Sequence, residues 1–243
     1  MGALRLRHWA VPSHVVRGVR QQRKFTFRQT RSSQAEITLE QAVNNLKSVP
    51  DHEVYTEWLS SETTLMQAPT TLIEETFIKR PNPQMYEILK DHKALPQLSS
   101  PLFAEAEMLQ SLSQNPHPNI IRYHGCRVLR GYFIGLVLEK HPHDLYTYLE
   151  KQVGTINKTA FINALKSALS HLHAQGLAHN DLSPHNVLVS QDGMPVLIDF
   201  QYIRGHHKWI DGKIKDYTTS TQEHDLSALV KIVAWIDKPV FDE

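Results

Sequence analysis

The first half of the chain carries the hydrophobic pattern of short strands. Runs rich in β-branched and aromatic residues are separated by polar breaks such as Ser60-Ser61. These runs are Val54–Leu59, Thr63–Gln67, Leu72–Lys79, Val128–Leu129 and Phe133–Leu138. Within Thr76-Phe77-Ile78-Lys79, strand alternation places Phe77 and Lys79 on one face. The pattern therefore predicts a β-rich unit in which one strand ends at a lysine.

A helix is predicted between the third and fourth of these runs. Ser100 caps it, Pro101 takes its first position, and an apolar stripe runs along it. The stripe consists of Leu102, Ala106, Leu109 and Leu112. At about 100° per residue, Glu105 lies beside the stripe, whereas Glu107 lies on the solvent side. A carboxylate beside an apolar stripe needs a partner, and Lys79 is the candidate.

Helical periodicity dominates the second half, which begins after a linker at residues 140–143. A short helix is expected at 144–151, and a longer one between an Asn157 cap and Gly176. A hairpin is predicted next, with strands 187–189 and 196–198 about the Asp192-Gly193 turn. The other expected segments are a capping-box helix beginning at Thr38, an irregular connection over Arg80–Ser99, and a last helix, capped by Thr221, that buries Leu226, Leu229, Val230 and Val233.

Length and charge divide the chain into three parts. Its 243 residues suffice for one large domain made of two lobes. Residues 1–35 carry eight basic residues and no acidic one, which favours a basic, disordered tail. Residues 36–140 would form a first lobe with a leading helix, and residues 141–243 a second, helical lobe. The predicted class is α+β.

Several classes of protein are disfavoured by composition. A single cysteine, Cys126, excludes an intramolecular disulfide and a cysteine-bound zinc cluster. The longest apolar run, Tyr132–Leu138, is too short to span a bilayer. The basic tail contains no module that reads nucleic acid, so no specific nucleic acid is expected. We expect a cytoplasmic protein; because the tail is rich in arginine, a mitochondrial presequence is the alternative.

Three polar residues in the second half have the spacing that phosphoryl transfer requires. Asp181 follows His179-Asn180, Asn186 comes five residues later, and Asp199 follows the predicted hairpin. One acid can orient an attacking hydroxyl, while the other acid and the amide can hold a metal ion. The hairpin is expected to bring Asn186 and Asp199 together at its open end, beside the loop that carries Asp181.

With these residues in place, residues 54–236 resemble the protein-kinase fold. The motifs that carry the resemblance are FIK, FAEAEMLQSL, HPNIIRYHG, LVLEKHPHDL, HNDLSPHN and LIDF. The chain looks most like short fungal kinase-like proteins. The resemblance implies a two-lobed fold with a small β-rich N-lobe and a truncated helical C-lobe, and it implies ATP and Mg²⁺ as cofactors.

The resemblance also implies roles for individual residues. Lys79, paired with Glu105, would contact the α- and β-phosphates of the nucleotide. Asp181 would accept the proton of the substrate hydroxyl, and Asn186 and Asp199 would hold Mg²⁺. The remaining roles are adenine contacts by the backbone of Glu139 and His141, a ribose contact by Asp144, a gatekeeper at Leu138, a hydrophobic spine of His179, Phe200 and Leu109, and anchoring of the catalytic loop by Asp225.

The chain departs from the family pattern in several places. No glycine occurs between Gly18 and Gly125, so residues around Ser60-Ser61 would have to cover the phosphates without one. Asn180, Ser183 and Gln201 replace, in that order, an arginine that reads activation-loop phosphorylation, the catalytic-loop lysine and the DFG glycine. A short C-lobe would expose apolar surface for a partner to cover.

Three functions fit these observations. The first is an ATP- and Mg-dependent kinase that acts on protein serine and threonine, and it is the one we favour. The second is a pseudokinase or scaffold that binds nucleotide or a partner without turnover, as the missing glycines suggest. The third is a small-molecule kinase of the aminoglycoside or choline type, which the HND motif and Ile198-Asp199-Phe200-Gln201-Tyr202 resemble.

Overall fold

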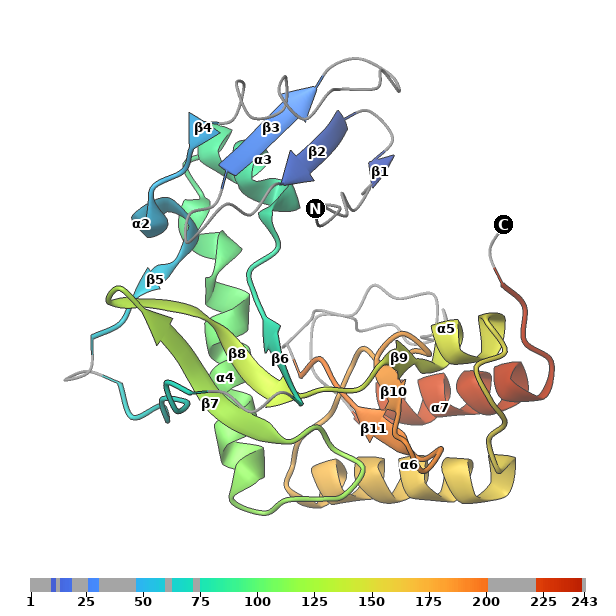
Figure 1. The fold of residues 1–243 in the computed structure, drawn as a ribbon. Helices are drawn as coiled ribbons and strands as arrows, with labels where there is room; N and C mark the ends of the chain where they lie inside the picture. The colour runs from blue at the N-terminus through green and yellow to red at the C-terminus, as the bar shows by residue number, and fades with distance from the viewer. Residues whose placement is uncertain are drawn as a thin grey trace. The chain divides into compact units, whose positions relative to one another are not determined.

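The computed structural model describes residues 10–11, 14–18, 26–30, 47–59, 63–71, 75–200 and 222–241, with backbone alone before residue 49 (Figure 1). Its contacts divide into two compact units. Unit 1 lies within Met1–Ser61, Pro81–Ser100 and Leu129–Ile134, and unit 2 within Glu62–Arg80, Pro101–Val128 and Gly135–Glu243. The lobe boundary expected near residue 140 stays a prediction.

Unit 1 begins with a small antiparallel sheet. Its strands are β1 (Ala10–Val11), β2 (His14–Gly18), β3 (Thr26–Thr30) and β4 (Lys47–Ser48), paired in that order. Strands β1, β2 and β3 fall within residues 1–35, and the β-branched and aromatic residues of β2 and β3 suit a sheet. The disorder expected of this tail from its charge stays a prediction. The capping-box helix expected from Thr38 lies outside the described residues.

The rest of unit 1 packs around a small apolar core. Its elements are α2 (Asp51–Val54), β5 (Thr56–Glu57), the 3₁₀ helices η1 (Pro83–Met85) and η2 (Leu95–Leu98), and α3 (Tyr86–Asp91). The core consists of Val49, Val54, Tyr55, Tyr86, Leu98 and Ile134. On its surface, Glu53 accepts hydrogen bonds from the Tyr86 hydroxyl and, at 2.9 Å, from Lys90 Nζ. These bonds hold the pKa of Glu53 below its usual value.

Two predictions for these segments were wrong. The connection over Arg80–Ser99 is helical, because the Asn82 side chain accepts a 3.1 Å bond from Gln84 N–H and caps η1. The run Val54–Leu59 yields only the strand Thr56–Glu57, since Val54 ends a helix. In both places a signal that starts a helix outweighed the composition of the surrounding segment. This signal is a capping residue in the first segment and an acidic first turn in the second.

The strands of unit 2 present the predicted lysine. Strand β6 (Thr76–Lys79) pairs antiparallel with β8 (Tyr132–Glu139), with Phe77 opposite Leu138 and Lys79 opposite Leu136. Strand β7 (Tyr123–Leu129) also pairs with β8. The turn between β7 and β8 places Arg130 and Gly131 at positive φ, as a two-residue type I′ hairpin requires.

Close backbone approach fixes the distance between β6 and β8. A Cβ on Gly135, whose φ is +157°, would stand 2.3 Å from the carbonyl oxygen of Lys79. Only glycine therefore fits at this point of β8. The sequence carried a signal for this, because Gly135 interrupts an otherwise apolar run.

The strand predicted over Thr63–Gln67 was wrong. In the described part of this segment only Gln67 forms a bridge, with Cys126. Cys126 N–H donates to Met66 O at 2.7 Å, and Cys126 O accepts from Ala68 N–H at 2.9 Å, so the segment meets β7 at this one point. The side chain of Gln110 holds two further backbone groups: its Oε1 accepts from Met66 N–H at 2.5 Å, and its Nε2 donates to Thr64 O at 3.0 Å. A helix side chain thus supplies part of the hydrogen bonding that a continuous ladder would provide.

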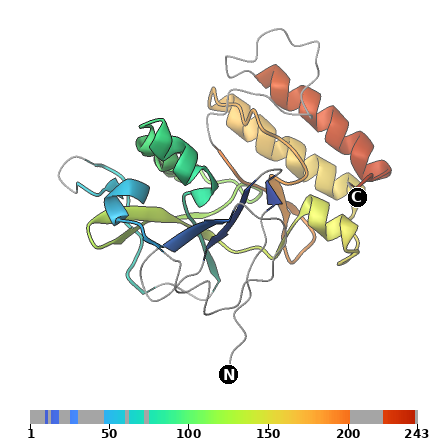
Figure 2. The ribbon, with the colours of Figure 1, turned by 90° about the horizontal axis from the view of Figure 1, so that it is seen from above.

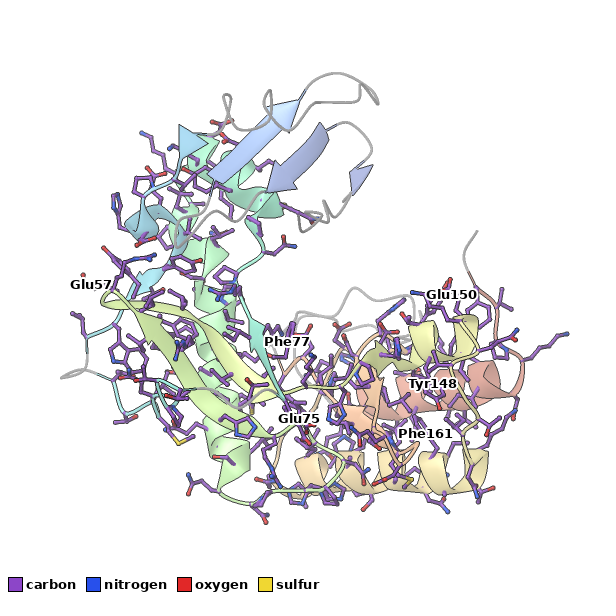
Figure 3. The ribbon with its side chains drawn as sticks, in the orientation of Figure 1. Glu57, Glu75, Phe77, Tyr148, Glu150 and Phe161 are labelled. Carbon is purple, nitrogen blue, oxygen red and sulfur yellow. The ribbon has the colours of Figure 1, made fainter. Side chains whose placement is uncertain are left out.

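Helices and a three-stranded sheet complete unit 2 (Figure 2). The helices are α4 (Ser100–Ser113), α5 (Leu145–Glu150), α6 (Lys158–Ala174) and α7 (Gln222–Asp237). The sheet pairs β9 (His143–Asp144), β10 (Val187–Val189) and β11 (Pro195–Leu197). The Asn157 side chain caps α6, as predicted, and Phe161 on that helix is fully buried (Figure 3).

The buried face of helix α7 agrees only in part with the predicted one. Leu229 is buried as predicted and Val233 is half-buried, whereas Leu226 and Val230 are 54% and 70% exposed. Asp225, Ile232 and Ile236 complete the buried stripe. The prediction was wrong for Leu226 and Val230 because it considered only apolar residues, and Asp225 belongs to the inner face. The Thr221 cap lies outside the described residues, and a partner covering this lobe stays a prediction.

The observed mixture of helices and sheets confirms the predicted α+β class. Among the described residues, no helix is both long and apolar enough to cross a bilayer.

Candidate functional site

The predicted lysine lies at the centre of an ion-pair cluster in unit 2. Lys79 Nζ is 2.8 Å from Glu105 Oε1, 2.6 Å from Glu105 Oε2 and 2.9 Å from Asp199 Oδ1. Glu105 is 1% exposed, so this contact pairs a buried carboxylate with a cation. Glu107 is exposed on the other side of α4. Helical geometry thus predicted correctly which of the two glutamates meets Lys79.

The loop that carries Asp181 is anchored by one buried carboxylate. Asp225, fully buried on α7, accepts 2.8 Å bonds from the backbone N–H of His179 and of Asn180. His173 Nε2 donates to the same carboxylate, also at 2.8 Å. Asn180 has φ of +61°, a strained backbone state that these bonds hold in place. The anchoring role expected of Asp225 is confirmed, whereas no pattern in the sequence pointed to His173.

Asp181 and Asn186 contact each other directly. Asn186 Nδ2 donates to the carbonyl oxygen of Asp181 and to its Oδ2, both at 2.8 Å. Because the nitrogen of the Asn186 amide is engaged as a donor, the acceptor that this side chain can offer is its oxygen. Ile198 N–H donates to Asn186 O at 3.1 Å, which links this pair to the residue that precedes Asp199. The hairpin therefore brings these residues together as predicted.

His179 supports the loop from inside the core. Its Nε2 donates to Ile198 O at 2.7 Å, so Nδ1 is the acceptor for Asp181 N–H at 3.3 Å. Its ring meets Phe200 edge-on, with centroids 5.2 Å apart. Leu109 is buried on α4. His179 therefore ties the backbone at Asp181 to the hairpin end, a packing role as the resemblance implies.

The linker residues have structural contacts of their own. Asp144 caps α5, accepting from Thr147 N–H at 2.7 Å and from Thr147 Oγ1 at 3.1 Å. Glu139 N–H donates to Arg122 O at 3.0 Å, and His141 Nε2 lies 3.7 Å from Glu139 Oε2. The nucleotide contacts expected of Glu139, His141 and Asp144 stay predictions. Ser60-Ser61 and Gln201 lie outside the described residues.

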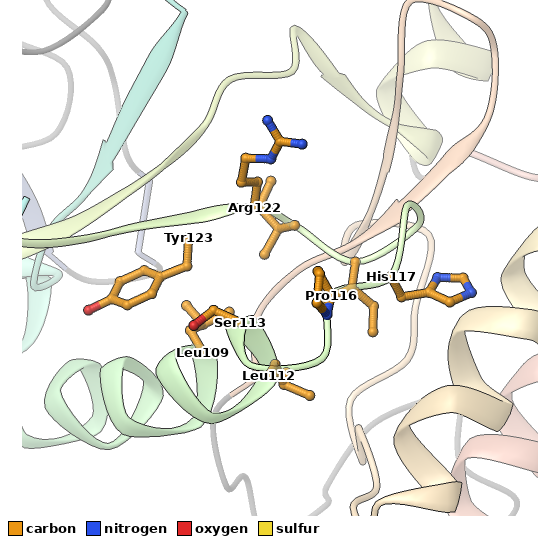
Figure 4. A pocket seen from close by; sticks show the side chains of 9 residues that line it. Leu109, Leu112, Ser113, Pro116, His117, Arg122 and Tyr123 are labelled. Atoms are coloured by element: carbon orange, nitrogen blue, oxygen red, sulfur yellow. The ribbon is translucent and has the colours of Figure 1, made fainter. Parts of the chain in front are cut away.

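A separate cavity of about 200 Å³ lies beside the C-terminal end of α4 (Figure 4). Its walls include Leu109, Leu112, Ile120, Ile121 and Tyr123, all buried. None of the predicted site residues lines it. Leu109 is one helical turn beyond Glu105, so the cavity borders the element that positions that glutamate.

The chemistry of the site suits a cation and a polyphosphate. With their carboxylates ionised, Glu105, Asp181 and Asp199 leave a formal excess of two negative charges over Lys79, which favours a bound cation. Asn186 and Asp199 offer the oxygen ligands that Mg²⁺ prefers, and Mg²⁺ usually completes its shell with phosphates and water. Among the described residues, no three His, Cys, Asp or Glu side chains form a ready-made metal site.

The site combines a strand lysine paired to a helix glutamate with an anchored Asp-Asn loop and a hairpin aspartate. This combination defines the kinase-fold class of proteins. Comparison with family models agrees: residues 85–220, more than half of the chain, match the protein kinase domain. The chain belongs to the protein kinase domain family. The matched range includes Glu105, Asp181, Asn186 and Asp199, while Lys79 precedes it.

Curated relatives are serine/threonine kinases and a cyclin-dependent kinase. The chain is 39% identical over 97 residues to probable serine/threonine-protein kinase mkcF of Dictyostelium discoideum, covering 37% of this chain and 13% of that protein. It is 34% identical over 110 residues to cyclin-dependent kinase 4 of Mus musculus, covering 41% and 36%. It is 35% identical over 92 residues to the mitochondrial kinase ppk24 of Schizosaccharomyces pombe, covering 35% and 20%. The matches thus span well under half of each relative's length.

Proposed function

We propose that this protein is an ATP- and Mg-dependent phosphotransferase that transfers the γ-phosphate of ATP to serine or threonine hydroxyls of proteins. One observation carries the proposal. Lys79 contacts both Glu105 and Asp199, and so joins a strand lysine to the metal-side aspartate across 120 residues of sequence. Such an arrangement serves to place a cation beside phosphate oxygens, which accounts for most of the catalysis of phosphoryl transfer.

In this proposal each residue has one task. Lys79 binds phosphate oxygens, while Glu105 holds its ammonium group in position. Asp181 accepts the proton of the substrate hydroxyl through the carboxylate oxygen that faces it, and the amide of Asn186 fixes that carboxylate by donating to Oδ2. Asn186 and Asp199 would hold Mg²⁺, which supplies charge neutralisation on the phosphates when bound.

The proposal predicts large losses of activity from single substitutions. Transfer of the γ-phosphate from ATP to a generic protein substrate is expected to fall about 100-fold or more in Lys79→Met, Asp181→Asn and Asp199→Ala, because each removes positioning or charge stabilisation. Glu105→Gln and Glu107→Gln form a matched pair on one helix, and only the first is expected to reduce activity. Unchanged activity in Lys79→Met and Asp199→Ala would refute the site as drawn.

A pseudokinase is the second candidate, favoured by the absence of glycine between Gly18 and Gly125. Thermal-shift titration separates the two. Stabilisation by ATP with Mg²⁺, together with phosphate transfer that Asp181→Asn abolishes, supports the enzyme. Stabilisation without transfer to protein or to a small-molecule alcohol supports the pseudokinase. Transfer to aminoglycosides or choline alone would support the small-molecule kinase. The name of one relative includes a mitochondrial location, whereas a cytoplasmic location remains our proposal.

A further inference from the structure

The cavity beside the C-terminal end of α4 is larger than the voids that well-packed proteins usually contain. Its volume of about 200 Å³ exceeds the roughly 150 Å³ of an engineered apolar cavity that stays dry and binds benzene. Protein interiors otherwise have few voids larger than a water molecule. The space is therefore large enough to hold a molecule with one aromatic ring.

The inner walls of the cavity are apolar. They consist of the buried side chains of Leu109, Leu112, Ile120, Ile121 and Tyr123. The hydroxyl of Tyr123 lies 3.2 Å from Cys126 Sγ, so it already has a partner. Among the described residues, no side-chain atom of these walls is both buried and without a hydrogen bond. The walls thus offer a ligand apolar contact rather than hydrogen bonds.

The polar residues that line the cavity lie at its rim or point elsewhere. Ser113 and Arg122 are exposed, and in Figure 4 the side chain of Arg122 points away from Leu109. The His117 ring donates through Nε2 to Ser167 Oγ on α6, at 3.1 Å. Water needs two to four polar partners to be held in a cavity. An apolar molecule therefore suits this space better than ordered water does.

Hydrogen bonds to two other elements hold the outer wall of the cavity in place. Asn119 O accepts from Leu197 N–H at 2.9 Å, and Asn119 Nδ2 donates to Pro195 O at 2.8 Å, which ties the wall to β11. His171 Nε2 on α6 donates to Asn115 O at 2.8 Å. A cavity closes where its walls can relax toward each other, and these bonds oppose that movement. The site is therefore preformed, and a ligand does not have to order it first.

We propose that this cavity, between α4 and residues 115–123, is a binding site for a small, uncharged molecule with a single apolar aromatic ring, about the size of toluene. Ser113 and Pro116, which are exposed, form the rim through which such a molecule enters. Binding removes apolar surface from water on both partners. The inference goes beyond the proposed function, because Lys79, Glu105 and the loop of Asp181 take no part in it.

The test compares toluene with phenol, which has the same number of non-hydrogen atoms but carries a hydroxyl. Binding of each compound to the full chain is measured by isothermal titration calorimetry without nucleotide. Toluene is expected to bind saturably. Phenol is expected to bind about 5- to 150-fold more weakly, the equivalent of 1–3 kcal/mol for a hydroxyl buried without a partner.

One pair of variants tests the place of binding. Leu112→Phe extends a ring from the wall into the cavity and is expected to weaken toluene binding about tenfold or more, because it fills the space that the ligand needs. Leu226→Phe makes the same replacement at a side chain that is 54% exposed on α7, and it is expected to bind toluene as the wild type does. Equal affinity of the two variants would place the ligand elsewhere and overturn the inference.

Methyl NMR spectra of the wild type locate the ligand without any substitution. Toluene is expected to shift the methyl resonances of Ile120 and Ile121 and to leave those of Ile232 and Ile236, which are buried on α7, unchanged. This measurement decides the matter even if Leu112→Phe does not fold. The inference is wrong if toluene does not bind saturably, if phenol binds equally well, or if the shifts are confined to α7.

Discussion

Replacing Asp225 by asparagine tests the anchor of the loop that carries Asp181 with the least change of shape. Asp225 is fully buried and accepts three hydrogen bonds, from His179 N–H, Asn180 N–H and His173 Nε2. The amide of asparagine replaces one acceptor oxygen by a donor. Whichever way the amide turns, one of the two backbone N–H groups then faces an N–H and loses its partner.

The size of the effect follows from these bonds. A buried donor left unsatisfied costs about 1–3 kcal/mol, and the surviving bond weakens by roughly 1 kcal/mol because it no longer meets a charge. Asp225→Asn is therefore expected to lower the free energy of unfolding by about 2–4 kcal/mol. For a chain of this size, that lowers Tm by roughly 4–16 °C.

Thermal and urea unfolding of the two proteins provides the measurement. Asp237→Asn is the matched control, because Asp237 lies on the same helix and makes an exposed pair with Lys158 at 3.2 Å. Exposed pairs contribute about 0–1 kcal/mol, so little change is expected there. If Asp225→Asn unfolds within about 0.5 kcal/mol of the control, the carboxylate does not anchor the loop and the reasoning fails.

Three further outcomes are expected. Gly135→Ala should destabilise the protein and weaken nucleotide binding, because the new Cβ would stand 2.3 Å from Lys79 O. Gly131 also has positive φ but open space around it, so Gly131→Ala measures the backbone strain alone, about 1–3 kcal/mol. Equal losses of stability in the two variants would contradict the close approach at Gly135. Burial and the nearby His171 lower the pKa of His117 in the folded protein. The stability that neutral His117 contributes is therefore present above pH 6.5 and is lost as the pH falls through 6.5 toward the folded pKa. The urea midpoint should accordingly fall less steeply between about pH 8 and pH 5.5 in His117→Gln than in the wild type. Burial raises the pKa of the Cys126 thiol to about 11, so at pH 8 only about a thousandth of it is thiolate. Labelling of Cys126 by a thiol reagent should therefore be slow in the folded protein and accelerate as denaturant is added. A labelling rate in the folded protein equal to that of a free thiol would contradict the burial.

The polar set of the candidate site was predictable because its members obey short-range rules. Asp181 and Asn186 lie in one loop, Asp199 ends a hairpin, and helical periodicity selects Glu105 over Glu107. Alternation along β6 gave the face of Lys79. Each of these inferences uses a repeat of a few residues, and the sequence expresses such repeats directly.

The failures share a different cause, which is competition from distant partners. Thr63–Gln67 has strand composition, yet of its described residues only Gln67 forms a bridge, and the Gln110 side chain bonds Met66 N–H and Thr64 O. Helix α7 turns inward the face that carries Asp225, because the loop at His179 and Asn180 needs that carboxylate. A pattern of apolar residues contains no record of either partner. Such contacts become visible only once the fold brings the segments together.

The sequence separations within the site have a consequence for the order in which it can form. Asp181 and Asn186 are five residues apart, whereas Lys79 and Asp199 are separated by 120. Closing the longer loop costs about 3 kcal/mol more in chain entropy. In a partly folded chain, Asp181 and Asn186 can therefore already be in contact before Lys79 has reached Asp199. A nucleotide bound as proposed would touch both halves, so it would bind only to chains that have completed the long-range step, and its binding would measure how much of a preparation has done so.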